Sequence, residues 1–218
     1  MSIEKTHVRK YPMDTTGFQN FFDQRPSKGD MKKLEIIKAA IDCIATIGFE
    51  KTTYQAIAEK LETRRAHIAY HFNDKADIFK ACILYINSNY KRILTEHLEG
   101  AKDGRESIKR YAESPFLWAE TNPSELSVML LFYYLCTIDE EYRNLNDELR
   151  TRGVERILLV LSQECQIDLP PLELELKAKQ IQNLISGSIM DAVTTRNKSL
   201  EQAKKETIKN IENLLERV

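Results

Sequence analysis

The sequence predicts an all-α protein in which three short N-terminal helices precede a C-terminal bundle of about six helices. The chain has 218 residues but only 7 glycines and 6 prolines, too few for the many turns of a β-sandwich or barrel. Apolar residues also recur three and four positions apart along most of the chain, as they do on one face of a helix. A hydrophobic share of 42% and a charged share of 30% are typical of a globular chain.

Residues 1–31 show no sustained apolar period, so we expect a partly flexible arm with at most one short helix, over Thr16–Gln24. The arm carries basic residues that offer contacts to an anionic partner: Arg9, Lys10, Arg25 and Lys28. The alternative is a mobile tail that contacts nothing.

The helical period becomes strong directly after the arm. Gly48 stops the first helix, and Thr52 or Thr53 caps the second. A tight turn separates the second helix from the third, and Asn73 or Asp74 caps a long fourth one. The predicted helices are Lys32–Ile47, Tyr54–Lys60, Arg64–His71 and one that ends near Leu98.

Five further helices are predicted beyond Gly104. Asn122-Pro123 and Pro170-Pro171 interrupt the helical pattern. The second of the five is apolar nearly all round, which is typical of a helix buried inside a bundle. The predicted helices are Glu106–Glu120, Ser124–Ile138, Glu140–Cys165, Leu172–Arg196 and Leu200–Arg217.

Charge is distributed unevenly along the chain. Residues 1–80 hold 14 basic against 11 acidic side chains, whereas the remainder holds 18 against 22. A mildly basic N-terminal part suits contact with phosphates.

Several classes of protein are disfavoured by what the sequence lacks. Four cysteines (Cys43, Cys82, Cys136 and Cys165) are scattered without metal-binding or redox spacing, and we expect them to be reduced core residues. With no signal peptide and no apolar run of membrane-spanning length, we expect a cytoplasmic protein. A phosphate loop, a nucleophile elbow and paired carboxylates are also missing, so we expect no enzyme, cofactor or metal.

Residues 54–71 form a predicted helix-turn-helix, the unit that places its second helix in the major groove of DNA. Polar side chains cluster on the outer face of that second helix: Arg64, Arg65, His67, Tyr70 and His71. Arginines at this place suit bidentate contact with guanine or charged contact with phosphate. His67 and His71 also share a helix face, as metal ligands would, but no third ligand is near in the sequence, which favours the DNA interpretation.

This region resembles the signature of the TetR family in a run that reads Lys33-x2-Ile36-Ile37-x-Ala39-Ala40-x3-Ile44-x3-Gly48-Phe49-x2-Thr52-Thr53-x3-Ile57-Ala58 and continues as Ile68-x-Tyr70-His71-Phe72-x2-Lys75-x2-Ile78. The resemblance implies that two threonines cap the second helix and touch phosphate, and that a lysine opens the fourth helix beside the phosphates. The implied DNA-binding residues are Thr52, Thr53, Arg64, Arg65, His67, Tyr70, His71 and Lys75.

The turn departs from the family pattern. Leu61-Glu62-Thr63-Arg64 stands where the family reads much like Ala-Gly-Val-Ser. Without the glycine, either Glu62 adopts an unfavourable backbone conformation or the turn has another shape. Thr63 is a candidate helix cap one position early. Ala69 replaces a common aromatic residue, with Tyr70 beside it.

Apolar stripes on the last two helices predict helix-to-helix contacts. The resemblance implies that these helices form a four-helix homodimer interface, and an intramolecular core is the alternative. The candidate interface residues are Ile181, Ile185, Ser188, Ile189, Ile208, Ile211 and Leu215, with the small Ser186 and Gly187 beside them.

Aromatic and sulfur-containing side chains between the fourth and eighth helices offer an effector pocket, of which we expect about half to line a cavity and half to be core. The candidates are Tyr111, Phe116, Trp118, Met129, Phe132, Tyr133, Tyr134 and Cys136.

The predicted organisation is an arm (1–31), a DNA-binding domain (32–76) and a sensing and dimerisation domain (77–218). The predicted function is that of a homodimeric repressor, released from a near-palindromic operator by a small, largely apolar or aromatic effector. The alternatives are a ligand-independent regulator that acts through a protein partner and a helical adaptor that does not bind DNA.

Overall fold

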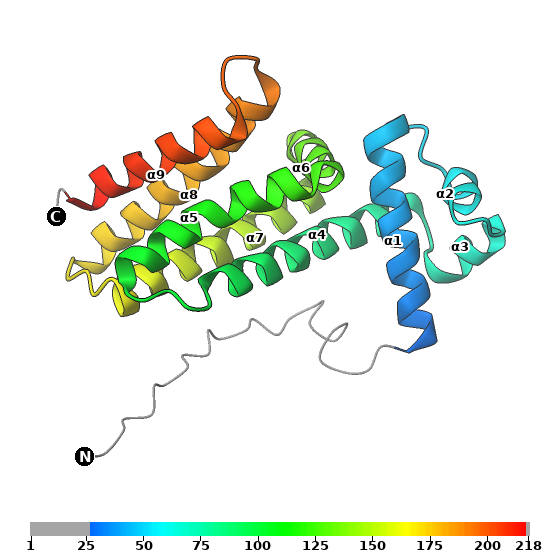
Figure 1. Ribbon diagram of the computed structural model, residues 1–218. Coiled ribbons are helices and arrows are strands. Elements are labelled where there is room, and N and C mark those ends of the chain that lie inside the picture. Colours follow the sequence, from blue (N-terminus) through cyan, green and yellow to red (C-terminus); the bar gives the residue numbers. More distant parts are fainter. Residues whose placement is uncertain (1–26, 217–218) are drawn as a thin grey trace.

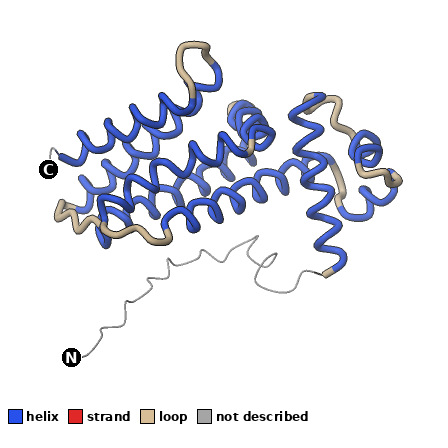
Figure 2. The backbone as a smooth tube through the Cα atoms, in the orientation of Figure 1, coloured by secondary structure: helices blue, strands red, loops and turns tan. Residues whose placement is uncertain are grey.

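The computed structural model describes residues 27–216 and confirms the all-α prediction (Figures 1 and 2). These residues form nine α-helices, with a π-helical segment, Val160–Glu164, directly after the seventh. The helices are α1 (Lys28–Ile47), α2 (Tyr54–Lys60), α3 (Arg65–His71), α4 (Lys75–Leu98), α5 (Gly104–Thr121), α6 (Pro123–Leu135), α7 (Glu140–Leu159), α8 (Pro171–Thr194) and α9 (Leu200–Glu216).

The first helix starts earlier than predicted. Ser27 and Asp30 form a capping box: the Ser27 side chain accepts from the Asp30 N–H at 3.1 Å, and the Asp30 carboxylate accepts from the Ser27 N–H at 3.0 Å. The predicted arm of residues 1–31 is therefore too long at its C-terminal end. The expected helix over Thr16–Gln24 and the basic residues Arg9, Lys10 and Arg25 lie outside the described residues.

Aspartates fix the starts of three later helices. The side chains of Asp74, Asp103 and Asp139 accept hydrogen bonds from backbone N–H groups in the first turns of α4, α5 and α7. The seventh helix changes to π-helical geometry at Val160, whereas the sequence predicted one helix up to Cys165.

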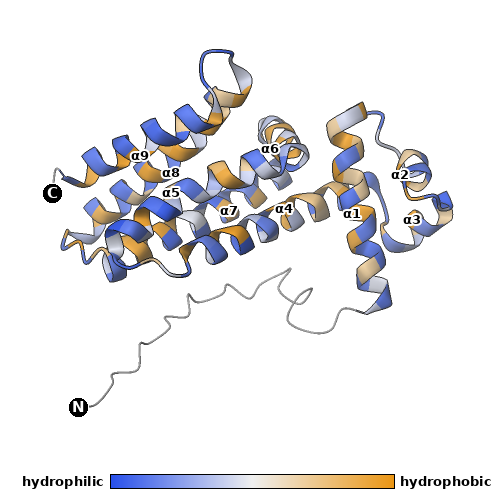
Figure 3. Ribbon diagram, viewed as in Figure 1, coloured by the Kyte–Doolittle hydropathy of each residue, from blue (hydrophilic) through white to orange (hydrophobic). Residues whose placement is uncertain are grey.

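The helices form two groups (Figure 1). One group consists of α1, α2 and α3, and the other is a bundle of α4, α5, α7, α8 and α9. The long α4 extends from the first group into the second, and α6 crosses between α1 and the bundle and packs against α1. Apolar residues face the interior of both groups (Figure 3).

The crossing helix α6 is less buried than its sequence predicted. Val128 and Phe132 have no exposed surface, but Tyr134 is 61% exposed and Ile138, just after the helix, is 66% exposed. The prediction of a helix buried on all sides is wrong. The helix α6 packs against α1 and the bundle, but these neighbours leave part of its surface, including Tyr134, uncovered. Within residues 27–216, no helix combines the length and the apolar composition needed to cross a bilayer.

Candidate functional site

The two short helices α2 and α3 are held in a fixed relation by a small apolar core. Ile57, Ala58 and Ile68 are at most 1% exposed. The Tyr54 hydroxyl at the start of α2 donates to the Phe72 carbonyl just after α3 at 3.0 Å. Since both ends are tied, the outward face of α3 is carried on a rigid support.

The turn between α2 and α3 contains the strain expected from the missing glycine. Glu62 has a φ of 50°, in the left-handed region that favours glycine. Thr63 is not the helix cap: its hydroxyl lies 3.0 Å from Nδ1 of His67, and Arg64 is the N-cap residue, with no side-chain capping bond. The two predictions for this turn thus differ in outcome, since Glu62 takes the strained conformation and Thr63 does not cap.

Most of the predicted DNA-binding side chains lie on the surface of this helix pair. Thr53, Arg64, Arg65 and His67 are exposed, and Tyr70 is 82% exposed. Thr53 also caps α2, because its hydroxyl accepts from the Ala56 N–H at 3.1 Å.

Three other predicted contact residues are less accessible. Thr52 is 2% exposed and its hydroxyl donates to the Gly48 carbonyl at 2.8 Å, so its predicted phosphate contact is wrong for the side chain. His71 is partly buried, and desolvation, followed by the charges of His67 and two lysines, lowers its pKa. Lys75 is also partly buried, with Nζ 4.0 Å from the centre of the Phe49 ring.

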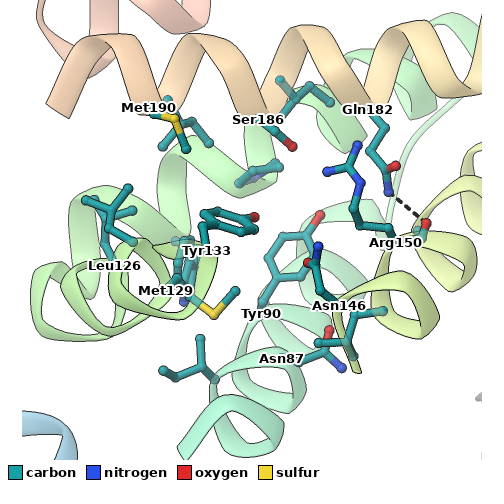
Figure 4. A pocket seen from close by; sticks show the side chains of 18 of the residues that line it. Asn87, Tyr90, Leu126, Met129, Tyr133, Asn146, Arg150, Gln182, Ser186 and Met190 are labelled. Atoms are coloured by element: carbon teal, nitrogen blue, oxygen red, sulfur yellow. Dashed lines mark hydrogen bonds between the residues drawn. The ribbon is translucent and has the colours of Figure 1, made fainter. Parts of the chain in front are cut away.

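A cavity of about 190 Å³ lies inside the bundle, between α4, α5, α6, α7 and α8 (Figure 4). Four of the eight candidates line it: Tyr111, Trp118, Met129 and Tyr133. The other four do not: Phe116 and Phe132 are fully buried core residues, Cys136 is buried with Sγ 3.4 Å from the Tyr142 carbonyl, and Tyr134 is exposed. The pocket prediction is therefore wrong for Phe116 and Phe132, whose rings fill the space between helices.

No sequence pattern indicated the polar side of this cavity. Arg150 and Arg156 on α7 and Gln182 and Ser186 on α8 line it together with Tyr90 on α4. Figure 4 shows Arg150, Tyr90, Tyr133 and Ser186 directed into one common space. These positions belong to helices whose sequences are mainly polar, so no local pattern distinguishes them from solvent-facing residues.

Hydrogen bonds hold this polar side in place. Nη2 of Arg150 donates to Oδ1 of Asn183 at 2.7 Å, and Nε2 of Gln182 donates to the Arg150 carbonyl at 2.9 Å. Nε of Arg156 is buried and has no hydrogen-bond partner among the described residues. Burial raises the pKa of Tyr111, and the Arg156 charge opposes part of that increase, so the Tyr111 phenol is neutral at physiological pH.

A row of aromatic rings connects the cavity to the N-terminal helices. Ring centres are separated by 6.3 Å between Tyr133 and Phe132, by 6.2 Å between Phe132 and Tyr142, and by 5.4 Å between Tyr142 and Phe79. Phe79 lies 5.1 Å from Phe49, against which Lys75 packs. The ring row therefore joins a pocket wall to the first turn of α4, next to α3.

Residues 36–82 match the model of a family described as bacterial regulatory proteins, tetR family. Over these residues the chain is similar to the TetR family of regulatory proteins. The matched region contains most of α1, all of α2 and α3, and the start of α4. No curated protein matches the sequence.

Solved structures share the TetR-like fold. A transcriptional regulator from Saccharomonospora viridis in complex with choline is 23% identical, covers 84% of this chain and 96% of its own, and has a TM-score of 0.74. A TetR-family regulator from Rhodococcus sp. is 19% identical, with coverages of 84% and 98% and a TM-score of 0.69. A regulator from Aquifex aeolicus VF5 is 16% identical, with coverages of 84% and 99% and a TM-score of 0.64.

Most of the predicted dimer stripe on α8 and α9 faces inward. Ile181, Ile185, Ile189 and Ile211 are between 0% and 8% exposed within one subunit, and Ile185 and Ile189 line the cavity. Their assignment to a dimer interface is therefore wrong, because the apolar faces of α8 and α9 close the subunit's own core.

The outer face of α8 and α9 is different in character. Ser188, Ile208 and Leu215 remain partly accessible. An open hollow on this side is lined by Gln180, Asn183, Leu184, Gly187, Ser188 and Leu214. A Cβ added to Gly187 would meet no atom within 4 Å, so the helix surface at this point is open.

Proposed function

We propose that this TetR-family protein is a cytoplasmic, homodimeric transcriptional repressor that releases a near-palindromic operator when a small molecule fills the bundle cavity. The observation that carries the DNA-binding part is the exposure of Arg64 and Arg65 at the start of a rigidly supported α3. Guanidinium groups at the N-terminal end of a recognition helix suit contact with guanine edges and phosphates. Tyr70 and His67 add exposed donors on the same short helix.

The test is a binding titration with the DNA directly upstream of the protein's own gene. Wild-type protein should bind tightly and with sequence preference, and Arg64→Ala combined with Arg65→Ala should lose this preference. The matched control is Arg105→Ala combined with Arg196→Ala, which removes the same charge at exposed positions of the C-terminal part. Weak binding that both double variants share, and that depends only on salt, would contradict the proposal.

The proposed dimer uses the outer face of α8 and α9. This face contains Gly187 and Ser188, whose small side chains permit close approach of a second helix pair. The α3 helices of two subunits must be about one DNA turn or more apart to occupy two half-sites of an operator. A symmetric dimer provides such a spacing.

Equilibrium sedimentation tests the dimer directly. Gly187→Arg should convert the protein to a monomer without loss of helicity, since the added side chain meets open space within the subunit. Gly187→Ala is the conservative control and should leave the dimer largely intact. A monomeric wild-type protein at micromolar concentration would refute the dimer.

Release by a ligand requires that the cavity communicates with α3. The row of rings from Tyr133 to Phe49 and the packing of α6 against α1 supply continuous contacts for this coupling. The choline complex of the Saccharomonospora viridis protein supports small-molecule binding by this fold. A regulator that acts only through a protein partner would not need the cavity, so the cavity favours the ligand-responsive function.

A further inference from the structure

The two cavity arginines point to the chemical class of the effector. Resting on the proposed ligand-responsive function, we propose that the cavity binds a small organic acid: an apolar or aromatic body with one carboxylate, held by Arg150 and Arg156. The body packs among the aromatic and aliphatic walls, and the carboxylate accepts hydrogen bonds from the guanidinium groups on α7.

The guanidinium groups of Arg150 and Arg156 have no acidic partner among the described residues. Within residues 27–216, neither Arg150 nor Arg156 takes part in an ion pair, whereas Arg152 between them pairs with Glu148 on the outer side of α7. Arg156 has a buried Nε without an acceptor. A guanidinium group that lines a cavity and has no acidic partner strengthens the binding of an anion in that cavity.

Among the described residues, the remaining wall of the cavity supplies no negative charge. The described lining residues include no aspartate or glutamate, so nothing there neutralises the two positive charges. The carboxylate of Glu125 contacts the lining residue Trp118, but it already accepts from Nε1 of Trp118 at 2.7 Å and from Nδ2 of Asn89 at 2.9 Å. Glu125 is 7% exposed and does not line the cavity.

The cavity lining is divided into apolar and polar parts. Leu126, Met129 and Leu130 on α6 and Trp118 on α5 supply apolar lining, and the arginines on α7 with Gln182 and Ser186 on α8 supply polar lining. Figure 4 shows Leu126 and Met129 on one side of the cavity and Arg150 with Gln182 on the other. An amphipathic molecule matches this division. Charge-assisted hydrogen bonds between arginine and carboxylate are also about twice as strong as neutral ones.

Aromatic rings alone would suit a cation instead, by cation–π attraction. Tyr90, Tyr111, Trp118 and Tyr133 line this cavity, so a cation is the opposing outcome. Two unneutralised guanidinium groups at the same cavity repel a cation and favour an anion. Probes that share an apolar chain and differ in the charge of the head group therefore distinguish an anion from a cation.

The experiment uses Trp118, the single tryptophan of the chain, as an internal reporter. Octanoate, 1-octanol and octyltrimethylammonium share one apolar chain and carry a negative, a neutral and a positive head. Each is titrated against the full-length protein while tryptophan fluorescence is recorded, and calorimetry provides a second readout. We expect octanoate to bind at least about tenfold more tightly than octanol, and the cation to bind least. Equal binding of octanoate and octanol, or preference for the cation, overturns the proposal.

Substitutions then locate the charge. Arg156→Met and Arg150→Met should each weaken octanoate binding by about tenfold to a hundredfold and leave octanol binding nearly unchanged. The matched control is Arg152→Met, on the same helix but outside the lining. If Arg152→Met weakens octanoate as much as the cavity variants do, the assignment is wrong. Circular dichroism of each variant separates lost folding from lost binding.

Binding and release are measured separately, so that the two proposals can fail independently. If octanoate binds through the arginines but operator DNA stays bound, the ligand class stands and ligand-induced release does not. If operator DNA is released by a neutral or cationic molecule while octanoate does not bind, release stands and the ligand class is overturned.

Discussion

Two pairs of arginines in this chain face opposite surroundings. Arg64 and Arg65 stand exposed at the start of α3, whereas Arg150 and Arg156 on α7 line a cavity inside the bundle. The outer pair is surrounded by water, in which one contact to an anion is weak, and the proposed partner DNA compensates with many phosphates. The inner pair lines a cavity whose described lining has no acidic residue, so that a single carboxylate is the proposed partner. The two proposals therefore give the same side chain a polyanion as partner in one place and a monovalent ligand in the other.

The largest expected effect separates these two pairs. Arg64→Ala combined with Arg65→Ala should weaken operator binding by about a hundredfold or more, since each base or phosphate contact is worth about 1–3 kcal/mol. The same variant should bind octanoate like the wild-type protein, measured by Trp118 fluorescence. A parallel loss of octanoate binding would show that the two pairs are not independent.

The next effect tests the connection between the two regions. Tyr142 is 7% exposed and its ring lies between those of Phe132 and Phe79. Tyr142→Leu interrupts the ring row and should reduce the ligand-induced change in operator affinity by about fivefold or more, within the usual range of coupling energies. Binding of ligand alone and of DNA alone should change less.

Tyr142→Phe is the control, because it keeps the ring and removes only the hydroxyl. It should retain the coupling of the wild-type protein. Full coupling in Tyr142→Leu would show that the ring row does not carry the signal and that the α6–α1 contact does so instead.

A smaller effect concerns the turn between α2 and α3. Glu62→Gly should raise the free energy of unfolding by about 0.5–1 kcal/mol, because glycine adopts a φ of 50° without steric cost but adds freedom to the unfolded chain. Urea denaturation measures this change. Glu62→Ala is the matched control: it also removes the charge, and without the glycine's freedom it should give no comparable gain.

The smallest effect concerns the buried carboxylate beside the cavity. Burial raises the pKa of Glu125 above the ordinary value of a glutamate side chain, so folding favours the protonated form and the wild-type protein loses stability as pH rises from that ordinary value. Glu125→Gln removes this dependence. Its stability relative to wild type should therefore be greater at about pH 7 than at about pH 5, as measured by thermal unfolding. A relative stability that is independent of pH would contradict this assignment.

The N-terminal helices α1 to α3 and the start of α4 could be predicted from the sequence because their signals are local. Gly48, Thr53 and Asp74 stop or cap helices within a few residues of where they stand. The α1 start was missed because the capping box of Ser27 and Asp30 precedes the apolar period. The strained backbone of Glu62 could be anticipated because the missing glycine is a local signal. The hydrogen bond between Thr63 and His67 could not, because it depends on side-chain geometry that sequence spacing does not determine.

The bundle could be predicted only in outline. An apolar stripe shows that a helix face is buried but not which neighbour buries it, so Ile181 and Ile185 were assigned to a dimer instead of the core. Phe132 and Tyr133 are adjacent and aromatic, and only the rotation of α6 sends one into the core and the other to the cavity. Arg156 was missed because its helix is mostly polar and its inward face follows from packing against α8.

The crossing helix α6 contributes to the cavity wall and also packs against α1. Anyone converting this regulator into a biosensor for a new compound thus faces two kinds of position. Under the proposed function, changes at Leu126, Met129 or Leu130 would alter both the compound that is recognised and the response of the promoter. Changes at Gln182 or Ser186, on a helix remote from α1, would alter the recognised compound and leave the response intact, so libraries for retargeting belong on α8.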